Sequence, residues 1–257
     1  MNKMQMIPVL DLLNGITVQA VAGRRKEYRP IRSCLTNSTD PCVVLRQLDQ
    51  VCKSENAYIA DLDAILNKQP NRCTLAELSR LNLNLMVDAG IQSCEEAEDL
   101  LDLGIRNVIV GLESLPDLDT ACKLIRHFGP EPLILSLDLK AGVPLTRDES
   151  WVQMEPLKVL ENLAEAGFRR WIVLDLAGVG KSQGVPTAEL CRQVRGLRPN
   201  DEIITGGGVR SINDLVQLHT IGIDGVLVAS ALHTGALTEQ NLDEWRRASA
   251  VQTQPGS

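Results

Sequence analysis

The sequence contains an internal repeat that covers most of its length. Residues 7–15 (IPVLDLLNG) have the pattern of a buried strand that ends in an acid and is followed by a glycine, and residues 133–142 (LILSLDLKAG) repeat it half a chain later. Three more strand-like segments recur in the same order, and they pair 58–62 with 172–176, 87–91 with 205–209, and 107–111 with 225–229. Four such units in duplicate make eight, and eight parallel βα units close into a barrel. We therefore predict an α/β fold, a (β/α)₈ TIM barrel with a duplicated half-barrel.

Short apolar runs predict the eight strands at residues 7–10, 57–60, 84–87, 107–110, 133–137, 171–174, 202–205 and 225–228. The runs are continuously apolar, which is typical of parallel strands covered on both faces. Helices are predicted to begin after Asp40, Ser93, Glu155 and Ser211, and to end at Gly104, Gly167 and Gly222. Since no linker divides the chain, residues 1–250 are predicted to form a single barrel domain, followed by a disordered tail at 251–257.

Composition narrows the classes of partner. The formal net charge is -7 and 3% of the residues are aromatic, so neither a nucleic acid nor an anionic membrane is predicted to bind. No apolar run approaches the ~20 residues of a membrane span. The 7 cysteines form no CxxC pair, which is typical of reduced thiols and predicts a cytoplasmic protein. The 3 histidines lack ligand spacing, so no metal or cofactor is predicted.

Two connections are longer than usual, and both are predicted at the C-terminal face of the barrel, where active sites of this fold lie. Residues 142–150 are polar and lead into Trp151. Residues 23–39 carry five basic side chains, Arg24, Arg25, Lys26, Arg29 and Arg32. Long loops at this face often serve as lids, although a solvated charged loop is an equal alternative.

Two acids, Asp11 and Asp138, follow equivalent strands of the two halves. The first and fifth strands of an eight-stranded barrel lie opposite each other, so the two carboxyl groups are predicted to face one another across the barrel mouth. One carboxyl group can donate a proton while the other removes one, which is acid–base chemistry that needs no metal. An aspartate at a strand end can also cap the next loop. The duplication of the pair favours catalysis by Asp11 and Asp138.

A glycine cluster (TGGGV) follows the seventh predicted strand. The backbone N–H groups of Gly206, Gly207 and Gly208 can approach a phosphate closely. Ala229 and Ser230, after the eighth strand, would complete a phosphate site in its usual position for this fold. A tight strand-to-helix turn is the alternative explanation for the glycines, and their place after the seventh strand favours phosphate binding.

Four further side chains are secondary candidates. Asp61 and Asp175 occupy equivalent places after the second and sixth strands. Asp61 could orient a catalytic group or bind loop amides, and the structural role is favoured, whereas Asp175 could add a third carboxylate to the pocket. Lys140 and Lys181 lie in loops at the same face. Either lysine could form a Schiff base if it were desolvated, but a solvated or phosphate-pairing lysine is the commoner case.

Five segments resemble the histidine-biosynthesis barrel family, and they are 7–12 (IPVLDL), 60–64 (ADLDA), 137–142 (LDLKAG), 205–209 (TGGGV) and 228–232 (VASAL). This family includes a ribotide isomerase and the cyclase subunit of imidazole glycerol phosphate synthase. Trp151 sits where the isomerase has a tryptophan in the loop after strand five, which favours the isomerase. The resemblance implies an Amadori rearrangement of an aminoaldose to an aminoketose, driven by the aspartates that match Asp11 and Asp138.

The chain departs from that family at the second phosphate site. The family has a glycine cluster followed by an arginine after strand three and a Gly-Thr after strand four, whereas this chain has Asp88, Gln92 and Glu113 in those loops. Two acids would repel a phosphate in a partly desolvated site. The family's Asp-Gly-Thr in the loop after strand six is also replaced, with Val179 and Lys181 at two of the changed positions.

We therefore predict an isomerase-like enzyme that acts on a phosphorylated sugar or heterocycle by Amadori-type aldose–ketose chemistry. One end of the substrate would carry a phosphate, and the other would be neutral or cationic. One alternative is an enzyme of tetrahydromethanopterin (one-carbon cofactor) biosynthesis with a different, singly phosphorylated substrate, since residues 60–65 and 28–31 resemble isomerase-like proteins linked to that metabolism. A non-catalytic metabolite-binding barrel is another. The oligomeric state stays open, a monomer included.

Overall fold

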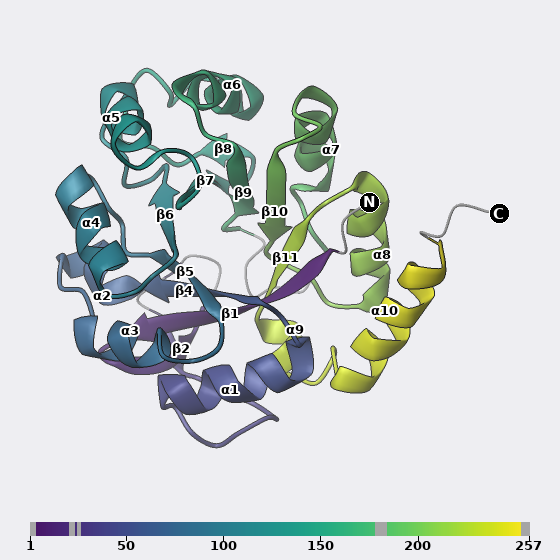
Figure 1. The fold of residues 1–257 in the computed structure, drawn as a ribbon. Coiled ribbons are helices and arrows are strands. Elements are labelled where there is room, and N and C mark those ends of the chain that lie inside the picture. Colours follow the sequence, from purple (N-terminus) through teal and green to yellow (C-terminus); the bar gives the residue numbers. More distant parts are fainter. Residues whose placement is uncertain (1–3, 21–23, 25–26, 178–183, 253–257) are drawn as a thin grey trace.

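The fold is a closed parallel barrel surrounded by helices, as predicted (Figure 1). The computed structural model describes residues 4–20, 24, 27–177 and 184–252. The barrel strands follow one another around the ring in chain order, and β11 pairs with β1 in parallel to close it. They are β1 (Gln5–Leu13), β4 (Asn56–Asp61), β5 (Asn84–Asp88), β6 (Asn107–Gly111), β7 (Leu133–Lys140), β9 (Arg170–Asp175), β10 (Glu202–Gly206) and β11 (Gly225–Val228).

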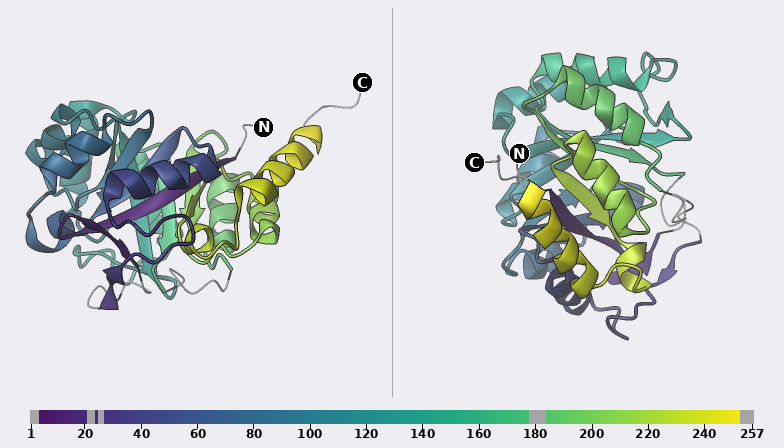
Figure 2. Two further views of the ribbon diagram at one scale, coloured as in Figure 1. Left: turned by 90° about the horizontal axis from the view of Figure 1, so that it is seen from below. Right: turned by 90° about the vertical axis from the view of Figure 1, so that its right-hand side faces the viewer.

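The helices lie outside the strands and pack around the barrel (Figures 1 and 2). They are α1 (Pro41–Cys52), α2 (Leu62–Asn67), α3 (Arg72–Leu78), α4 (Cys94–Asp102), α5 (Leu118–Phe128), α6 (Pro156–Ala166), α7 (Ala188–Leu197), α8 (Ile212–Ile221), α9 (Ser230–His233) and α10 (Glu239–Gln252). The predicted helix starts at Asp40 and Ser93 are confirmed by their caps, because each side chain accepts from the N–H of the third residue after it. The helix α6 follows Glu155 without a side-chain cap. Ser211 and Asp214 form a capping box at α8.

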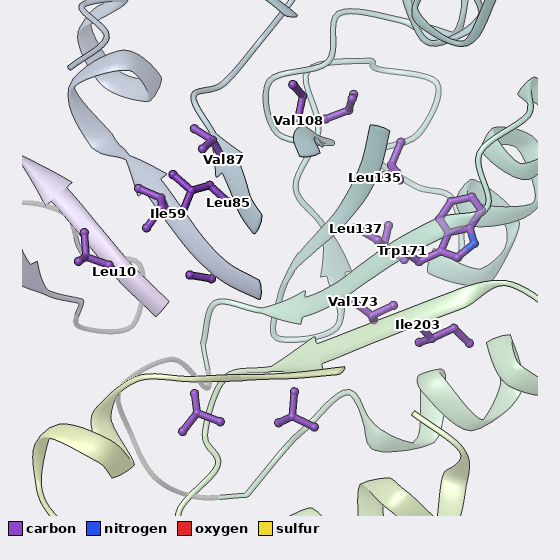
Figure 3. Close-up of a cluster of buried hydrophobic side chains, with 14 of the residues drawn as sticks. Leu10, Ile59, Leu85, Val87, Val108, Leu135, Leu137, Trp171, Val173 and Ile203 are labelled. Carbon is purple, nitrogen blue, oxygen red and sulfur yellow. The ribbon is translucent and has the colours of Figure 1, made fainter. Parts of the chain in front are cut away.

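Side chains alternate along each strand between two apolar layers. The outer layer lies between strands and helices, and Figure 3 labels part of it, namely Leu10, Ile59, Leu85, Val87, Val108, Leu135, Leu137, Trp171, Val173 and Ile203. The inner layer fills the barrel with the residues between them, including Ile7, Met86, Ile109, Ile134 and Ile172. Because successive residues of a strand point to opposite faces, this parity decides which acids can face the barrel interior.

Each half of the chain begins with a strand that continues into a hairpin. The prediction that these strands end at Asp11 and Asp138 is wrong, since β1 runs to Leu13 and β7 to Lys140. Each strand then turns back to pair with an antiparallel partner, β2 (Ile16–Gln19) or β8 (Val143–Pro144). Both two-residue turns have positive φ throughout, at Asn14-Gly15 and at Ala141-Gly142, which is the geometry that matches the right-handed twist of the strands.

The first hairpin carries the basic connection. A third strand, β3 (Arg29–Pro30), pairs with β2 and extends this hairpin away from the ring. Arg24 and Arg32 are exposed. At the other end of the chain, α10 includes Gln252, and residues 253–257 of the predicted tail lie outside the described residues. Within the described ranges, no helix combines the length and apolar character needed to cross a membrane.

Candidate active site

A cavity opens at the carboxyl ends of the barrel strands and brings together both predicted catalytic aspartates and four of the predicted phosphate-site residues. Asp11, Asp138, Gly207, Gly208, Ala229 and Ser230 all line it. Asp11 on β1 and Asp138 on β7 come from strands that lie opposite each other in the ring. Other polar side chains in its wall are Thr17, Gln19, Tyr28, Tyr58, Asp88, Glu113 and His233.

The two predicted catalytic aspartates occupy strand positions whose side chains face the barrel interior. Asp11 follows Ile7 and Val9, and Asp138 follows Ile134 and Ser136, at two-residue spacing. Asp138 is 6% exposed, and its Oδ1 accepts a hydrogen bond of 2.8 Å from the Ser136 hydroxyl. This bond fixes the orientation of a buried carboxyl group that faces the cavity. The structure thus brings the two aspartates into one cavity from opposite sides of the ring.

A phenol and a third carboxyl group lie at the first-half side of the cavity. The Tyr58 hydroxyl donates to Oδ2 of Asp88 at 3.2 Å, and Oδ1 of Asp88 accepts from the Gly90 N–H at 3.0 Å. Burial raises the pKa of Tyr58 well above its ordinary value, and the charges of Asp88, Asp138 and Asp11 raise it further. Tyr58 therefore stays a neutral hydrogen-bond donor beside three acids.

Gly111 at the end of β6 lies between two of these carboxyl groups. A Cβ at Gly111 would lie 3.6 Å from Oδ2 of Asp138 and 3.7 Å from Oδ2 of Asp88. Glu113, two residues later, adds a fourth acid to the cavity wall. The side of the cavity built from β5 and β6 is therefore acidic, as the departures at Asp88 and Glu113 predicted.

Gln92 lies among cations that the sequence did not place there. In the amide orientation that satisfies both of its polar atoms, its carbonyl accepts from Lys68 Nζ at 3.3 Å and from Arg147 at 2.8 Å. Arg147 belongs to the long connection after β8, far away in sequence. Gln92, Lys68 and Arg147 are not part of the cavity wall among the described residues.

The glycine cluster divides into a packing residue and two cavity residues. A Cβ at Gly206 would lie 2.7 Å from Leu227 Cβ and 2.8 Å from the Leu227 carbonyl oxygen, so only glycine fits between β10 and β11. Gly207 and Gly208 follow with positive φ and line the cavity, whereas Gly206 is not in its described wall. Their backbone is therefore open to close approach by a ligand.

Sequence reasoning missed His233, the last residue of α9. His233 lines the cavity close in sequence to Ser230, and it is 6% exposed. Its Nδ1 lies 3.0 Å from the Ser33 hydroxyl oxygen, in the connection after β3. Burial lowers the pKa of His233 from 6.5 to about 4, so the ring is neutral near pH 7. The signal in the sequence was its position, three residues after the predicted phosphate ligand Ser230.

Asp61 and Asp175 occupy strand positions whose side chains face away from the barrel interior, and both are absent from the described cavity wall. Asp61 caps α2 and accepts from the backbone N–H and the side-chain amide of Asn71 at 2.7 Å each. Asp175 accepts from the N–H groups of Ala141 and Gly142 in the second hairpin turn, at 3.0 and 2.9 Å. The idea that Asp175 adds a carboxylate to the pocket is therefore corrected, because its oxygens hold the hairpin.

Two other candidates, Lys140 and Trp151, are absent from the described cavity wall. Lys140 is exposed at the end of β7. Trp151 is 2% exposed and packs in the outer apolar layer, so its ring stabilises the connection after β8. Lys181 and Val179 lie outside the described residues. Within the described part of the chain, no three His, Cys, Asp or Glu side chains are grouped as metal ligands.

Comparison with known proteins agrees with this geometry. The model of a family described as histidine biosynthesis protein matches residues 5–238. The chain belongs to this family. Among its relatives in the family is the 1-(5-phosphoribosyl)-5-((5-phosphoribosylamino)methylideneamino) imidazole-4-carboxamide isomerase (the ribotide isomerase) of Deinococcus radiodurans. That relative is 34% identical over 184 residues, which cover 70% of this chain and 76% of the relative.

Two other relatives match this chain over a longer span. The ribotide isomerase of Campylobacter jejuni is 29% identical over 243 residues, covering 91% of this chain and 95% of the relative. An uncharacterized protein of Methanocaldococcus jannaschii is 30% identical over 236 residues, covering 91% of this chain and 95% of that protein. The resemblance found in the sequence motifs is thus confirmed at the level of the family and its barrel fold.

Proposed function

We propose that this protein is an aldose–ketose isomerase of the Amadori type, acting on a phosphorylated sugar or heterocycle. The observation that carries the proposal is the pair Asp11 and Asp138, which line one cavity from opposite strands of the barrel. Relatives named as ribotide isomerases support the reaction class.

The reaction needs two proton transfers, and the cavity offers two carboxyl groups for them. One carboxyl group protonates the ring oxygen of an aminoaldose, which opens the ring and gives the imine. The other removes the proton at C2 to give the enolamine, which then becomes the aminoketose. Tyr58 stays neutral at the cavity wall and can donate a hydrogen bond to a substrate oxygen without competing as a base.

The two ends of the cavity favour different substrate groups. Gly207, Gly208, Ala229 and Ser230 give a small-residue wall through which backbone N–H groups can reach a phosphate. The opposite wall has Asp88 with Glu113 nearby, and negative charge there would repel a second phosphate. We therefore favour a substrate that is phosphorylated at one end and neutral or cationic at the other. A one-carbon cofactor precursor and a non-catalytic role stay as alternative predictions.

The test is turnover of aminoaldose substrates by wild-type protein and by Asp11→Asn and Asp138→Asn. Each substitution removes a proton-transfer group while keeping the side-chain volume, so we expect a fall in turnover of about 10²- to 10⁴-fold. Substrates would be the ribotide of the relatives and a panel of singly phosphorylated aminoaldoses. Glu98→Gln, an equal change at an exposed position of α4, is the control. Unchanged turnover in folded aspartate variants would refute the proposal.

A further inference from the structure

The connection after β3 is fastened to the phosphate side of the cavity at one place. Three contacts hold it against α9, where the Cys34 N–H donates to the His233 carbonyl at 2.9 Å, the Cys34 thiol lies 3.5 Å from the Leu232 carbonyl, and Ser33 meets the His233 ring. These residues are 198 to 200 positions apart in sequence. A contact of this separation fixes the connection to the site that follows the last barrel strand.

The Nδ1 atom of the His233 ring contacts Ser33, which leaves Nε2 for a second hydrogen bond. Within the described part of the chain, its hydrogen-bond partner is the Ser33 hydroxyl, at Nδ1. A neutral imidazole carries one N–H and one acceptor nitrogen. If Nδ1 accepts from the Ser33 hydroxyl, the proton sits on Nε2, and the ring presents a donor to whatever it meets there.

We propose that His233 is a phosphate ligand and a positioning residue, donating its Nε2–H to the substrate phosphate while Nδ1 accepts from Ser33. The inference rests on the proposed function, because it assumes that a phosphate occupies the cavity beside Ser230. The same ring then has two tasks, since it binds the anion and holds the connection after β3 against α9.

The burial of His233 suits this role. At 6% exposure, the ring is shielded from water, where a hydrogen bond to a dianion is stronger than it would be at the surface. A neutral donor also avoids burying an extra charge while the site is empty. In the proposed arrangement the Ser33 hydroxyl donates to Nδ1 and keeps the proton on Nε2, so its removal should weaken phosphate binding although Ser33 makes no contact with the phosphate.

Two amide variants, His233→Gln and His233→Asn, separate binding of the phosphate from the contact with Ser33. Glutamine places its amide near the position of Nε2, whereas asparagine places its amide near that of Nδ1. We expect His233→Asn, which keeps a partner for Ser33, to weaken the binding of inorganic phosphate by about tenfold or more. His233→Gln should retain most of the affinity. Equal affinity of wild type and His233→Asn would overturn the proposal, as would a larger loss in the Gln variant.

The tautomer can be read directly from ¹⁵N-labelled protein, because the chain has only 3 histidines. We expect the Nε2–H form of His233 in wild type, a shift of its Nε2 resonance on addition of inorganic phosphate, and a mixture of tautomers in Ser33→Ala. An Nδ1–H form, or a His233 ring unmoved by phosphate, would refute the inference. So would a wild-type protein that binds no phosphate at millimolar concentration.

These outcomes are independent of those for the reaction. If Asp11→Asn keeps turnover while phosphate still shifts the His233 resonance, the proposed function fails and the phosphate contact stands. If the aspartate variants lose turnover while phosphate does not shift the His233 resonance, the proposed function stands and the phosphate contact of His233 is refuted.

Discussion

The two ends of the cavity come from equivalent places in a repeated sequence, yet they have opposite chemistry. In the repeat, Asp88 after β5 matches Gly206 after β10. The first end is acidic and carries a hydrogen-bonded phenol, whereas the second has small residues, exposed backbone and a neutral imidazole at His233. The described wall of the cavity thus has the carboxyl groups of Asp88 and Glu113 at one end, and Gly207, Gly208, Ala229 and Ser230 at the other.

The shared features show what the barrel itself requires. Both halves keep an inward aspartate, a two-residue hairpin turn, and an outward aspartate that binds backbone N–H groups, namely Asp61 or Asp175. These outward acids hold loops and helices in place in both halves. The duplicated positions thus maintain the fold and keep the pair of aspartates that we propose as proton-transfer groups, whereas the unequal positions give the two ends of the cavity different charge.

The largest effect that we expect on stability concerns the neutral imidazole of the second end. The pKa of His233 is lowered from 6.5 to about 4 by burial, so between these values the unfolded chain binds a proton that the folded protein does not. The free energy of unfolding should therefore fall as pH decreases from 6.5 to 4, by about 3 kcal/mol from this group. Above pH 6.5 the group should add no pH dependence.

Chemical denaturation of His233→Gln and wild type at several pH values measures this. The variant should lose that part of the acid dependence and approach wild type in stability, or exceed it, near pH 4. His127→Gln, which changes an exposed histidine, should keep the wild-type slope. If the free energy of unfolding falls equally with pH in wild type and in His233→Gln, the imidazole is not held neutral. The neutral imidazole would then no longer distinguish the second end of the cavity from the first.

Parity explains how much of this site the sequence could predict. The strands, their order and the opposition of Asp11 and Asp138 follow from apolar runs and the repeat. Counting by twos from Ile59 to Asp61 and from Val173 to Asp175 would also have placed both acids on the outer face, where the structure has them. That alternation was hidden because both faces of each strand are buried and equally apolar.

The contacts between distant loops could not be predicted in this way. His233 meets Ser33 across 200 positions, and Arg147 meets Gln92 from a different half-barrel. No periodicity encodes such contacts, since loops are fixed by tertiary packing and not by local pattern. Trp151 shows the same limit, because a motif position predicted a site residue while packing placed its ring in the outer layer.

A smaller effect should distinguish the glycines of the two ends. Gly206→Ala would force a Cβ to within 2.8 Å of the Leu227 backbone, so we expect a loss of about 2 kcal/mol in the free energy of unfolding. Gly111→Ala meets its nearest side-chain atom at 3.6 Å and should fold with little loss. Thermal unfolding of both variants tests this. If the Gly206 variant is as stable as the Gly111 variant, the close approach of β10 and β11 is not a constraint.

The smallest effect concerns the acidic end and tests the contrast most directly. Asp88→Asn keeps an acceptor for the Tyr58 hydroxyl but removes a charge from the cavity wall, and Glu113→Gln removes another. We expect each change to raise the affinity for a doubly phosphorylated ribotide by about tenfold, or about 1.4 kcal/mol, because a charge repulsion in a partly desolvated site is relieved. Affinity for inorganic phosphate should stay the same, since that anion binds at the other end.

The ratio of the two affinities, measured by calorimetry, is the decisive quantity. Glu98→Gln on the outside of α4 lowers the net negative charge by the same amount and should leave the ratio at its wild-type value. Should Asp88→Asn and Glu113→Gln also leave the ratio unchanged, the acids do not exclude a phosphate. The first end would then accept the same group as the second, and the substrate would be doubly phosphorylated in spite of Asp88 and Glu113.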